Sequence, residues 1–173
     1  ISLSGEAYFK VAKENTRPFC VRSGEYCLKV YGTEFNLNTY DEENIEAVLV
    51  KGSVGFQANE AAPEKRLKVN QLGVANSKTG TSVIQDVDVT SYIAWKNHDL
   101  IFVNEELESI MKKVSRWYDV NIIFEDEVSK AVRFNGNIPK YAELEKLLYV
   151  MEKTSDVRFR ITDKTIRITK RKK

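Results

Sequence analysis

The spacing of the apolar residues changes near residue 90, and this change is the strongest constraint on the fold. Upstream, short apolar runs alternate with polar residues and are separated by Gly, Asn and Asp turns, which is typical of β-strands. Downstream, two segments carry apolar residues at spacings of three and four, as amphipathic helices do. The sequence therefore predicts an all-β unit, solenoid-like or sandwich-like, over residues 1–92 and a small α+β domain over residues 93–173.

The predicted all-β unit contains a series of short strands. Ala7–Val11, Phe19–Arg22 and Tyr26–Val30 are the first three, and alternation places the apolar side chains of the second and third on one face. Shorter apolar runs predict further strands at residues 35–37, 47–50 and 54–56. We expect the aromatic residues of this unit to fill its core, although they could instead line a ligand groove.

The two cysteines, Cys20 and Cys27, flank a predicted hairpin turn at Ser23-Gly24. A two-residue turn there would place Cys20 directly opposite Cys27, with both sulfur atoms on the same face of the hairpin. Opposed residues at this register form the wider, hydrogen-bonded kind of pair, which is acceptable but not ideal for a disulfide. A disulfide and a reduced pair of small side chains both remain open, because the cysteine count does not decide between them.

The first half of the predicted α+β domain reads strand, helix, strand. The apolar run Leu100–Val103 predicts the first strand, and Asn104 is a good N-cap for the helix that follows. This helix has one apolar stripe, which runs from Leu107 to Tyr118. The apolar residues of Val120–Phe124 predict the next strand.

The second half reads strand, helix, strand, strand. A strand at Val132–Phe134 is expected to end at Asn135-Gly136-Asn137, and Pro139 suits the first turn of the second helix. Alternating apolar and basic residues over Val157–Thr169, around a turn at Asp163-Lys164, predict a terminal β-hairpin. The domain thus has a βαβ–βαββ layout, and we expect both helices to lie on one face of a small sheet.

The sequence contains no arrangement of residues typical of an enzyme. Its single histidine, His98, excludes a His-paired nucleophile or a multi-His metal site within the chain and suits an exposed turn. The acidic runs Asp41-Glu42-Glu43 and Glu125-Asp126-Glu127 look like solvated loop charges and lack the ligand spacing of a calcium loop. No glycine loop of the kind that binds phosphates is present. We therefore expect no catalysis, no cofactor and no metal.

The charge and hydropathy of the chain exclude two further classes. The formal net charge of +2 is too small to indicate a nucleic-acid-binding protein, and the basic tail at residues 170–173 is typical of a solvated end. No apolar run approaches the roughly 20 residues that a membrane helix needs. Because the first residues are unlike a secretory leader and lie in a predicted strand, we expect the chain to be a fragment of a longer protein.

Several motifs occur in an order that is more specific than any one of them alone. In the first unit they are Gly5–Val11, Arg17-Pro18-Phe19, Val30–Leu37 and Val48–Val54. In the second unit they are Trp95-Lys96-Asn97, Leu100–Leu107, Ser115–Val120 and Phe134–Ile138. Together these motifs resemble the FecR family of anti-sigma regulators, and those of the second unit resemble the C-terminal domain common in Bacteroidetes-type FecR proteins.

This resemblance implies the periplasmic sensor region of a transmembrane anti-sigma factor. Such regulators hold an extracytoplasmic-function sigma factor through a cytoplasmic segment and are anchored to the inner membrane by one helix, and we expect neither part in this chain. Their periplasmic region is thought to receive a signal from the signalling domain of a TonB-dependent outer-membrane transducer. The β unit is expected to be truncated at its N-terminus, and the second unit is similar to the small domain that begins secretins and TonB-dependent receptors.

The terminal hairpin is the predicted binding site for this partner. Arg158, Arg160, Lys164 and Arg167 would flank an edge strand with free backbone groups and could meet an acidic protein surface. The same basic residues could instead serve only to keep the edge strand soluble. A second hypothesis assigns direct sensing of a glycan or a siderophore fragment to the aromatic residues of the β unit.

Overall fold

The computed structural model describes residues 1–14, 19–24, 26–41, 43–59, 61–139 and 141–171, so Arg17 and Pro18 of the family motif lie outside the described residues. The chain divides into two units, Ile1–Lys96 and Asn97–Lys173, and each is described here by itself. The expected boundary after residue 92 falls inside a short helix, α1 (Val89–Ile93). The chain is mostly β, with several sheets and few helices, as predicted.

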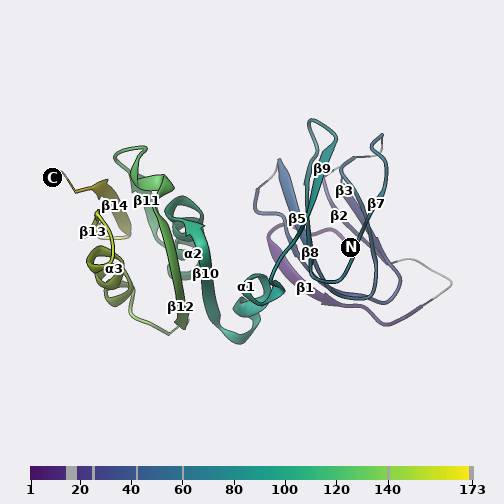
Figure 1. The fold of residues 1–173 in the computed structure, drawn as a ribbon, viewed down its shortest axis with the longest axis horizontal. Helices are drawn as coiled ribbons and strands as arrows, with labels where there is room; N and C mark the ends of the chain where they lie inside the picture. Colours follow the sequence, from purple (N-terminus) through teal and green to yellow (C-terminus); the bar gives the residue numbers. More distant parts are fainter. Residues whose placement is uncertain (15–18, 25, 42, 60, 140, 172–173) are drawn as a thin grey trace. The chain divides into compact units, whose positions relative to one another are not determined.

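Two antiparallel sheets make up the first unit (Figure 1). The five-stranded sheet has the order β1-β4-β5-β8-β9, with β1 (Glu6–Lys10), β4 (Glu34–Asn38), β5 (Asn44–Lys51), β8 (Gln71–Asn76) and β9 (Thr81–Asp86). The four-stranded sheet has the order β2-β3-β6-β7, with β2 (Phe19–Ser23), β3 (Tyr26–Val30), β6 (Val54–Gln57) and β7 (Lys65–Leu67).

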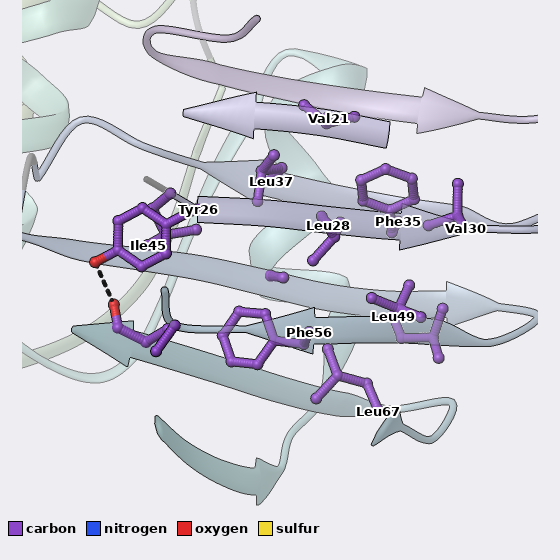
Figure 2. Packing of buried hydrophobic residues seen from close by; sticks show 14 residues of the cluster. Val21, Tyr26, Leu28, Val30, Phe35, Leu37, Ile45, Leu49, Phe56 and Leu67 are labelled. Atoms are coloured by element: carbon purple, nitrogen blue, oxygen red, sulfur yellow. Dashed lines mark hydrogen bonds between the residues drawn. The ribbon is translucent and has the colours of Figure 1, made fainter. Parts of the chain in front are cut away.

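Apolar side chains from both sheets meet in one core (Figure 2). Phe35 and Leu49 of the five-stranded sheet pack with Val21, Leu28 and Phe56 of the four-stranded sheet, and all five are buried. Alternation along the strands turns these residues inward, because successive side chains of a strand point to opposite faces. Of the two architectures left open by the sequence, the observed one is a sandwich.

Gly32 and Thr33, which belong to a family motif, lie where two backbone segments approach closely. Gly32 has a φ of 102°, and a Cβ atom there would come within 2.5 Å of the Cα atom of Lys13. Only glycine combines this conformation with this proximity. Thr33 is buried, exchanges backbone hydrogen bonds with Val11, and donates its hydroxyl to the carbonyl oxygen of Ser53 at 2.8 Å. The Gly-Thr pair is therefore required by the packing of this junction.

The hairpin of β2 and β3 has a different register from the one predicted. Ser23 lies opposite Tyr26, so that Cys20 is opposite Lys29 and not opposite Cys27. The turn begins at Gly24, which has a φ of 55°, a conformation that glycine adopts without strain. The predicted and observed registers differ by two residues, and therefore the same side chains face the core in both. For this reason the hydrophobic pattern could not distinguish them.

A short helical segment, α1 followed by the 3₁₀ turn η1 (Ala94–Asn97), was not predicted from the sequence. Asp88 caps α1 by accepting the N–H of Thr90 at 2.9 Å. The indole N–H of Trp95 donates to the side-chain oxygen of Asn36 at 3.2 Å. The Lys96 ammonium lies 3.4 Å from the ring centroid of Tyr8. The first unit thus holds this segment through side chains of β1 and β4.

In the second unit the strands form two sheets and not the single small sheet that we expected (Figure 1). β10 (Asp99–Glu106) pairs with β12 (Arg133–Pro139), whereas β14 (Thr165–Lys170) lies between β11 (Asn121–Phe124) and β13 (Val157–Thr162). The helices are α2 (Leu107–Tyr118) and α3 (Leu144–Lys153), with a 3₁₀ turn η2 at Ser129–Ala131. One apolar core joins both sheets to both helices.

The helix α2 begins later than predicted, because Asn104 belongs to a strand and not to a helix cap. β10 continues to Glu106 and is interrupted by a bulge between Phe102 and Glu105, where Asn104 has a φ of 49°. The N–H of Asn104 donates to the side-chain oxygen of Asn135 at 2.8 Å. This bond across β10 and β12 explains why an asparagine that resembles a cap lies in a bulge.

The strand β12 is longer than predicted, since it runs through Asn135-Gly136-Asn137 and ends at Pro139. Each of these residues pairs with, or lies beside, a residue of β10, and Pro139 is opposite Asp99 at the end of the ladder. Pairing with β10 therefore outweighs the low strand propensity of Asn and Gly. Pro139 is tolerated at the end of the strand and does not enter the helix α3, which starts at Leu144.

Candidate functional site

The sheet β11-β14-β13 has one buried face and one exposed face. Val157, Ile166 and Ile168 are buried in the core of the second unit, and Phe159 packs against them. The residues that alternate with these, including Arg158, Arg160 and Arg167, are exposed. Three of the four predicted partner-binding residues are therefore brought together on one face, which we call the arginine face (Arg158, Arg160, Arg167).

The register of the sheet sets the spacing of the charges on the arginine face. Arg160 lies opposite Arg167, and Arg158 lies opposite Thr169. On the other side of β14, Ile123 is the partner of Arg167 and has 38% of its surface exposed. The alternation of β11 could have shown that Ile123 belongs to this face, but its pairing with β14 is not visible in the sequence.

One carboxylate accompanies the three arginines. Glu125 follows β11 directly, and its Oε1 atom lies 3.6 Å from Nη1 of Arg167. Both side chains are about half exposed, so this ion pair contributes little to stability. Neither Arg158 nor Arg160 forms an ion pair with another residue in the described part of the chain. Two guanidinium groups with five N–H donors each therefore face solvent.

Lys164, the fourth predicted residue, lies in the turn between β13 and β14 and not on the arginine face. Its ammonium forms an ion pair with Asp119, the residue that ends α2 in a left-handed conformation. The hydrogen bond and the charge of Lys164 lower the pKa of Asp119. Lys164 thus has a local partner that sequence reasoning missed, because the two residues are 45 positions apart.

β13 is an edge strand, as the hypothesis of strand addition requires. One of its outward-pointing backbone N–H groups, however, is already bonded to a side chain. A two-residue turn makes Thr162 and Thr165 a hydrogen-bonded pair, so Phe159 and its neighbours two positions away point their backbone groups outward. The outward N–H of Phe159 donates to Oε1 of Glu152 in α3 at 2.6 Å. A carboxylate on an exposed edge hinders the addition of another strand. The geometry therefore favours docking on the face of the sheet over pairing at its edge.

The acidic runs, which the sequence presents as solvated loop charges, have separate structural roles. Glu125 pairs with Arg167, whereas Glu127 pairs with Lys130. Asp126 accepts hydrogen bonds from the backbone N–H groups of Ser129 and Lys170, both at 2.7 Å. The bond from Lys170, followed by the bond from Ser129, lowers the pKa of Asp126. Such carboxylates do not converge on a common point.

The histidine and the first acidic run also do not form a site with other residues in the described part of the chain. His98 is exposed, and its ring lies 6.1 Å from the ring of Tyr141. Asp41 accepts the backbone N–H of Glu43, while Glu42 lies outside the described residues. Among the residues that the structure describes, no group of three or more His, Cys, Asp or Glu side chains is arranged to hold a metal ion.

The aromatic residues of the first unit divide between the core and the surface. Phe35 and Tyr26 are buried, and the ring of Phe9 stacks on that of Phe35 with centroids 5.0 Å apart. Tyr31 and Tyr40 are about half exposed. A cavity beside Tyr26, between the two sheets, has a volume of about 10 Å³, which is room for about one water molecule. This space is too small for a sugar or a siderophore fragment.

Two family models match the chain. The model described as FecR protein matches residues 1–55, and the model described as FecR, C-terminal, matches residues 99–168. Together they span most of the sequence, and the chain belongs to the FecR family. The arginine face lies within the part matched by the C-terminal model.

Solved structures share the fold of the whole chain. A structure of a candidate anti-sigma factor from Parabacteroides distasonis ATCC 8503 at 1.65 Å resolution has a TM-score of 0.85 and 24% sequence identity, over 99% of this chain and 80% of that chain. A second structure of a candidate anti-sigma factor from this organism, at 2.50 Å, has a TM-score of 0.84 and 24% identity, over 99% and 79%. A search of curated proteins finds no significant match.

Family membership supports a regulatory role of the anti-sigma factor type. Within the described ranges, no helix combines the length and the apolar character needed to cross a membrane.

Proposed function

We propose that the chain is the periplasmic sensor region of a transmembrane FecR-type anti-sigma factor, and that it works by binding another protein and not by catalysis. Its partner in this proposal is the signalling domain of a TonB-dependent outer-membrane transducer. The observation that carries the proposal is the arginine face: Arg158, Arg160 and Arg167 are exposed on one side of a sheet whose other side is buried.

The chemistry of this face suits an acidic protein surface. A guanidinium group binds a carboxylate through two parallel N–H donors, which gives orientation as well as attraction. Arg158 and Arg160 have no carboxylate partner among the described residues, so docking would not break an existing ion pair. Complementary charge increases the association rate more than it increases the affinity, which fits a signal receiver that must respond quickly.

In this proposal the signal passes from the second unit to parts of the regulator outside these 173 residues. An inner-membrane helix would anchor the protein, and a cytoplasmic segment would hold the extracytoplasmic-function sigma factor. Neither a cofactor nor a nucleic acid takes part in this mechanism.

The test is a binding titration of the chain against the signalling domain of the cognate transducer. Arg158→Glu combined with Arg160→Glu should weaken binding about tenfold or more, and binding of the wild type should weaken as ionic strength rises. A matched control is Lys112→Glu combined with Lys146→Glu, which makes the same change in net charge at exposed helix positions. If the arginine variant binds as tightly as the wild type, the arginine face is not the docking site.

The alternative, direct sensing of a glycan or siderophore fragment by the first unit, has weaker support because its buried aromatic residues belong to the core. A thermal-shift screen of the chain with such compounds distinguishes the two ideas, since any ligand of the folded state must raise the melting temperature. A concentration-dependent shift without the transducer would favour direct sensing over protein docking.

A further inference from the structure

The side chains of Cys20 and Cys27 meet on the outward side of the β2–β3 hairpin. Cys20 lies opposite Lys29, and Cys27 lies opposite Arg22, so the two cysteines are diagonal neighbours on the same face. Their Sγ atoms are 2.6 Å apart, although both thiols are free in the structure. Two unbonded sulfur atoms do not normally approach this closely, while a disulfide needs about 2.05 Å.

We propose that Cys20 and Cys27 form an intramolecular disulfide that ties β2 to β3. Diagonal residues on neighbouring strands have Cα atoms about 7–8 Å apart in a regular sheet, just beyond the usual reach of a disulfide. The contact between the sulfur atoms shows that this hairpin brings the two side chains within range. This inference stands independently of the proposed docking site, since the hairpin belongs to the first unit.

The position of β2 gives this bond a structural role. β2 lies at the end of the four-stranded sheet, with β3 as its partner on one side. On the other side it holds the start of the chain, where Arg22 donates its N–H to Ile1 at 2.7 Å and Leu3 donates to Arg22 at 2.9 Å. β2 also contributes Val21 to the core. A bond from Cys20 to Cys27 would therefore secure an end strand that carries both core and terminal contacts.

The oxidation requires a partner disulfide, from a small molecule or a thiol oxidoreductase. One cysteine thiolate attacks that disulfide, which breaks its S–S bond, expels one of its sulfurs as a thiolate and gives a mixed disulfide. The second cysteine thiolate attacks the mixed disulfide, forms the bond between Cys20 and Cys27, and expels the other sulfur of the oxidant. Overall the two thiols lose two protons and two electrons, and the oxidant gains them as two thiols. Burial, followed by the hydrogen bond with Cys20, raises the pKa of Cys27 to about 11. Oxidation should therefore be faster in alkaline solution, because the thiolate is the reactive form.

The test equilibrates the 173-residue chain with a glutathione and glutathione-disulfide buffer set to an oxidising potential, then alkylates it with N-ethylmaleimide under denaturing conditions. We expect a mass that carries neither N-ethylmaleimide nor glutathione before reduction, and two N-ethylmaleimide adducts after reduction. Two bound glutathiones before reduction would contradict the bond. Two adducts without reduction would overturn the proposal. Cys20→Ser is the control, because it cannot close this bond: before reduction Cys27 should carry one glutathione or one N-ethylmaleimide, and after reduction one N-ethylmaleimide.

Thermal denaturation gives a second readout. A reductant should lower the melting temperature of the wild type by several degrees, and it should not change that of Cys20→Ser combined with Cys27→Ser. If the melting temperature of the oxidised wild type does not change when the reductant is added, the bond does not have this structural role.

Discussion

Arg160 and Arg167 lie directly opposite each other on β13 and β14, with both side chains on the exposed face of the sheet. Hydrogen-bonded pairs in an antiparallel ladder have Cα atoms about 5.5 Å apart, so these two positive charges repel each other. Glu125 compensates for one of them through its contact with Arg167. The repulsion between Arg160 and Arg167 lowers the stability of the free protein, and an acidic partner would relieve it. This arrangement is therefore consistent with a binding surface for an acidic protein.

Replacing Arg160 should therefore move stability and binding in opposite directions. Arg160→Glu converts a like-charge pair into an attractive pair with Arg167, and we expect the free energy of unfolding to rise by about 0.2–1 kcal/mol. Binding to the transducer domain should weaken. Urea denaturation measures the first effect. Arg158→Glu is the control, because Thr169 opposite it carries no charge, and an equal gain in that variant would contradict the explanation.

The hydroxyl of Tyr26 should be important for the stability of the sandwich. It lies 2.5 Å from the carbonyl oxygen of Glu43 and 2.8 Å from that of Ala75, accepts the N–H of Ser77 at 2.6 Å, and lies at one end of the core (Figure 2). Tyr26→Phe removes the hydroxyl on which these backbone groups converge, which should cost about 1–3 kcal/mol in urea denaturation. Tyr31→Phe removes the hydroxyl of an exposed tyrosine and should change the stability little.

Glu152 should protect the free edge of β13. Glu152→Ala removes the acceptor of the Phe159 N–H, and we expect faster hydrogen exchange at that amide together with increased self-association of the chain. Glu152→Gln keeps an oxygen acceptor at the same place and serves as the matched control. Exchange at Phe159 that is as slow in the alanine variant as in the wild type would show that another group covers the edge.

Asp126 should contribute to stability in a pH-dependent way. Its pKa is lowered in the folded protein, chiefly by the N–H of Lys170, so its contribution is present above the unfolded pKa of about 3.9 and disappears as the pH falls through the folded value. Asp126→Asn should cost about 1 kcal/mol near neutral pH. The difference between the urea midpoints of the two proteins should be constant above about pH 4 and should shrink as the pH falls toward about 2. A difference that is the same at every pH would exclude this origin.

Much of the fold follows from local patterns in the sequence. The alternation over Phe19–Val30 placed Val21 and Leu28 in the core, and the alternation over Val157–Thr169 placed the arginines on the opposite face from Val157. The stripe that starts at Leu107 likewise lies in the core of the second unit. These inferences hold because the direction of a side chain depends only on the conformation of its own segment.

The candidate site could be predicted only in part. Arg158, Arg160 and Arg167 share a face as their spacing requires, but Lys164 pairs with Asp119, and Ile123 and Glu125 join the face from another strand. The spacing of apolar and polar residues within a single segment does not reveal any of these contacts. They depend on the parallel pairing of β11 with β14, which joins segments that are far apart in the chain.

By itself, the sequence of this protein determined which residues of its main strands and helices face a core, and the motifs of its family. Tertiary structure alone decided the register of the β2–β3 hairpin, the bulge at Asn104 and the extension of β12 to Pro139. The reason is that alternation reports only the face on which a side chain lies. The partner of each strand, and its alignment along that partner, depend on contacts between distant segments that compete with local preference.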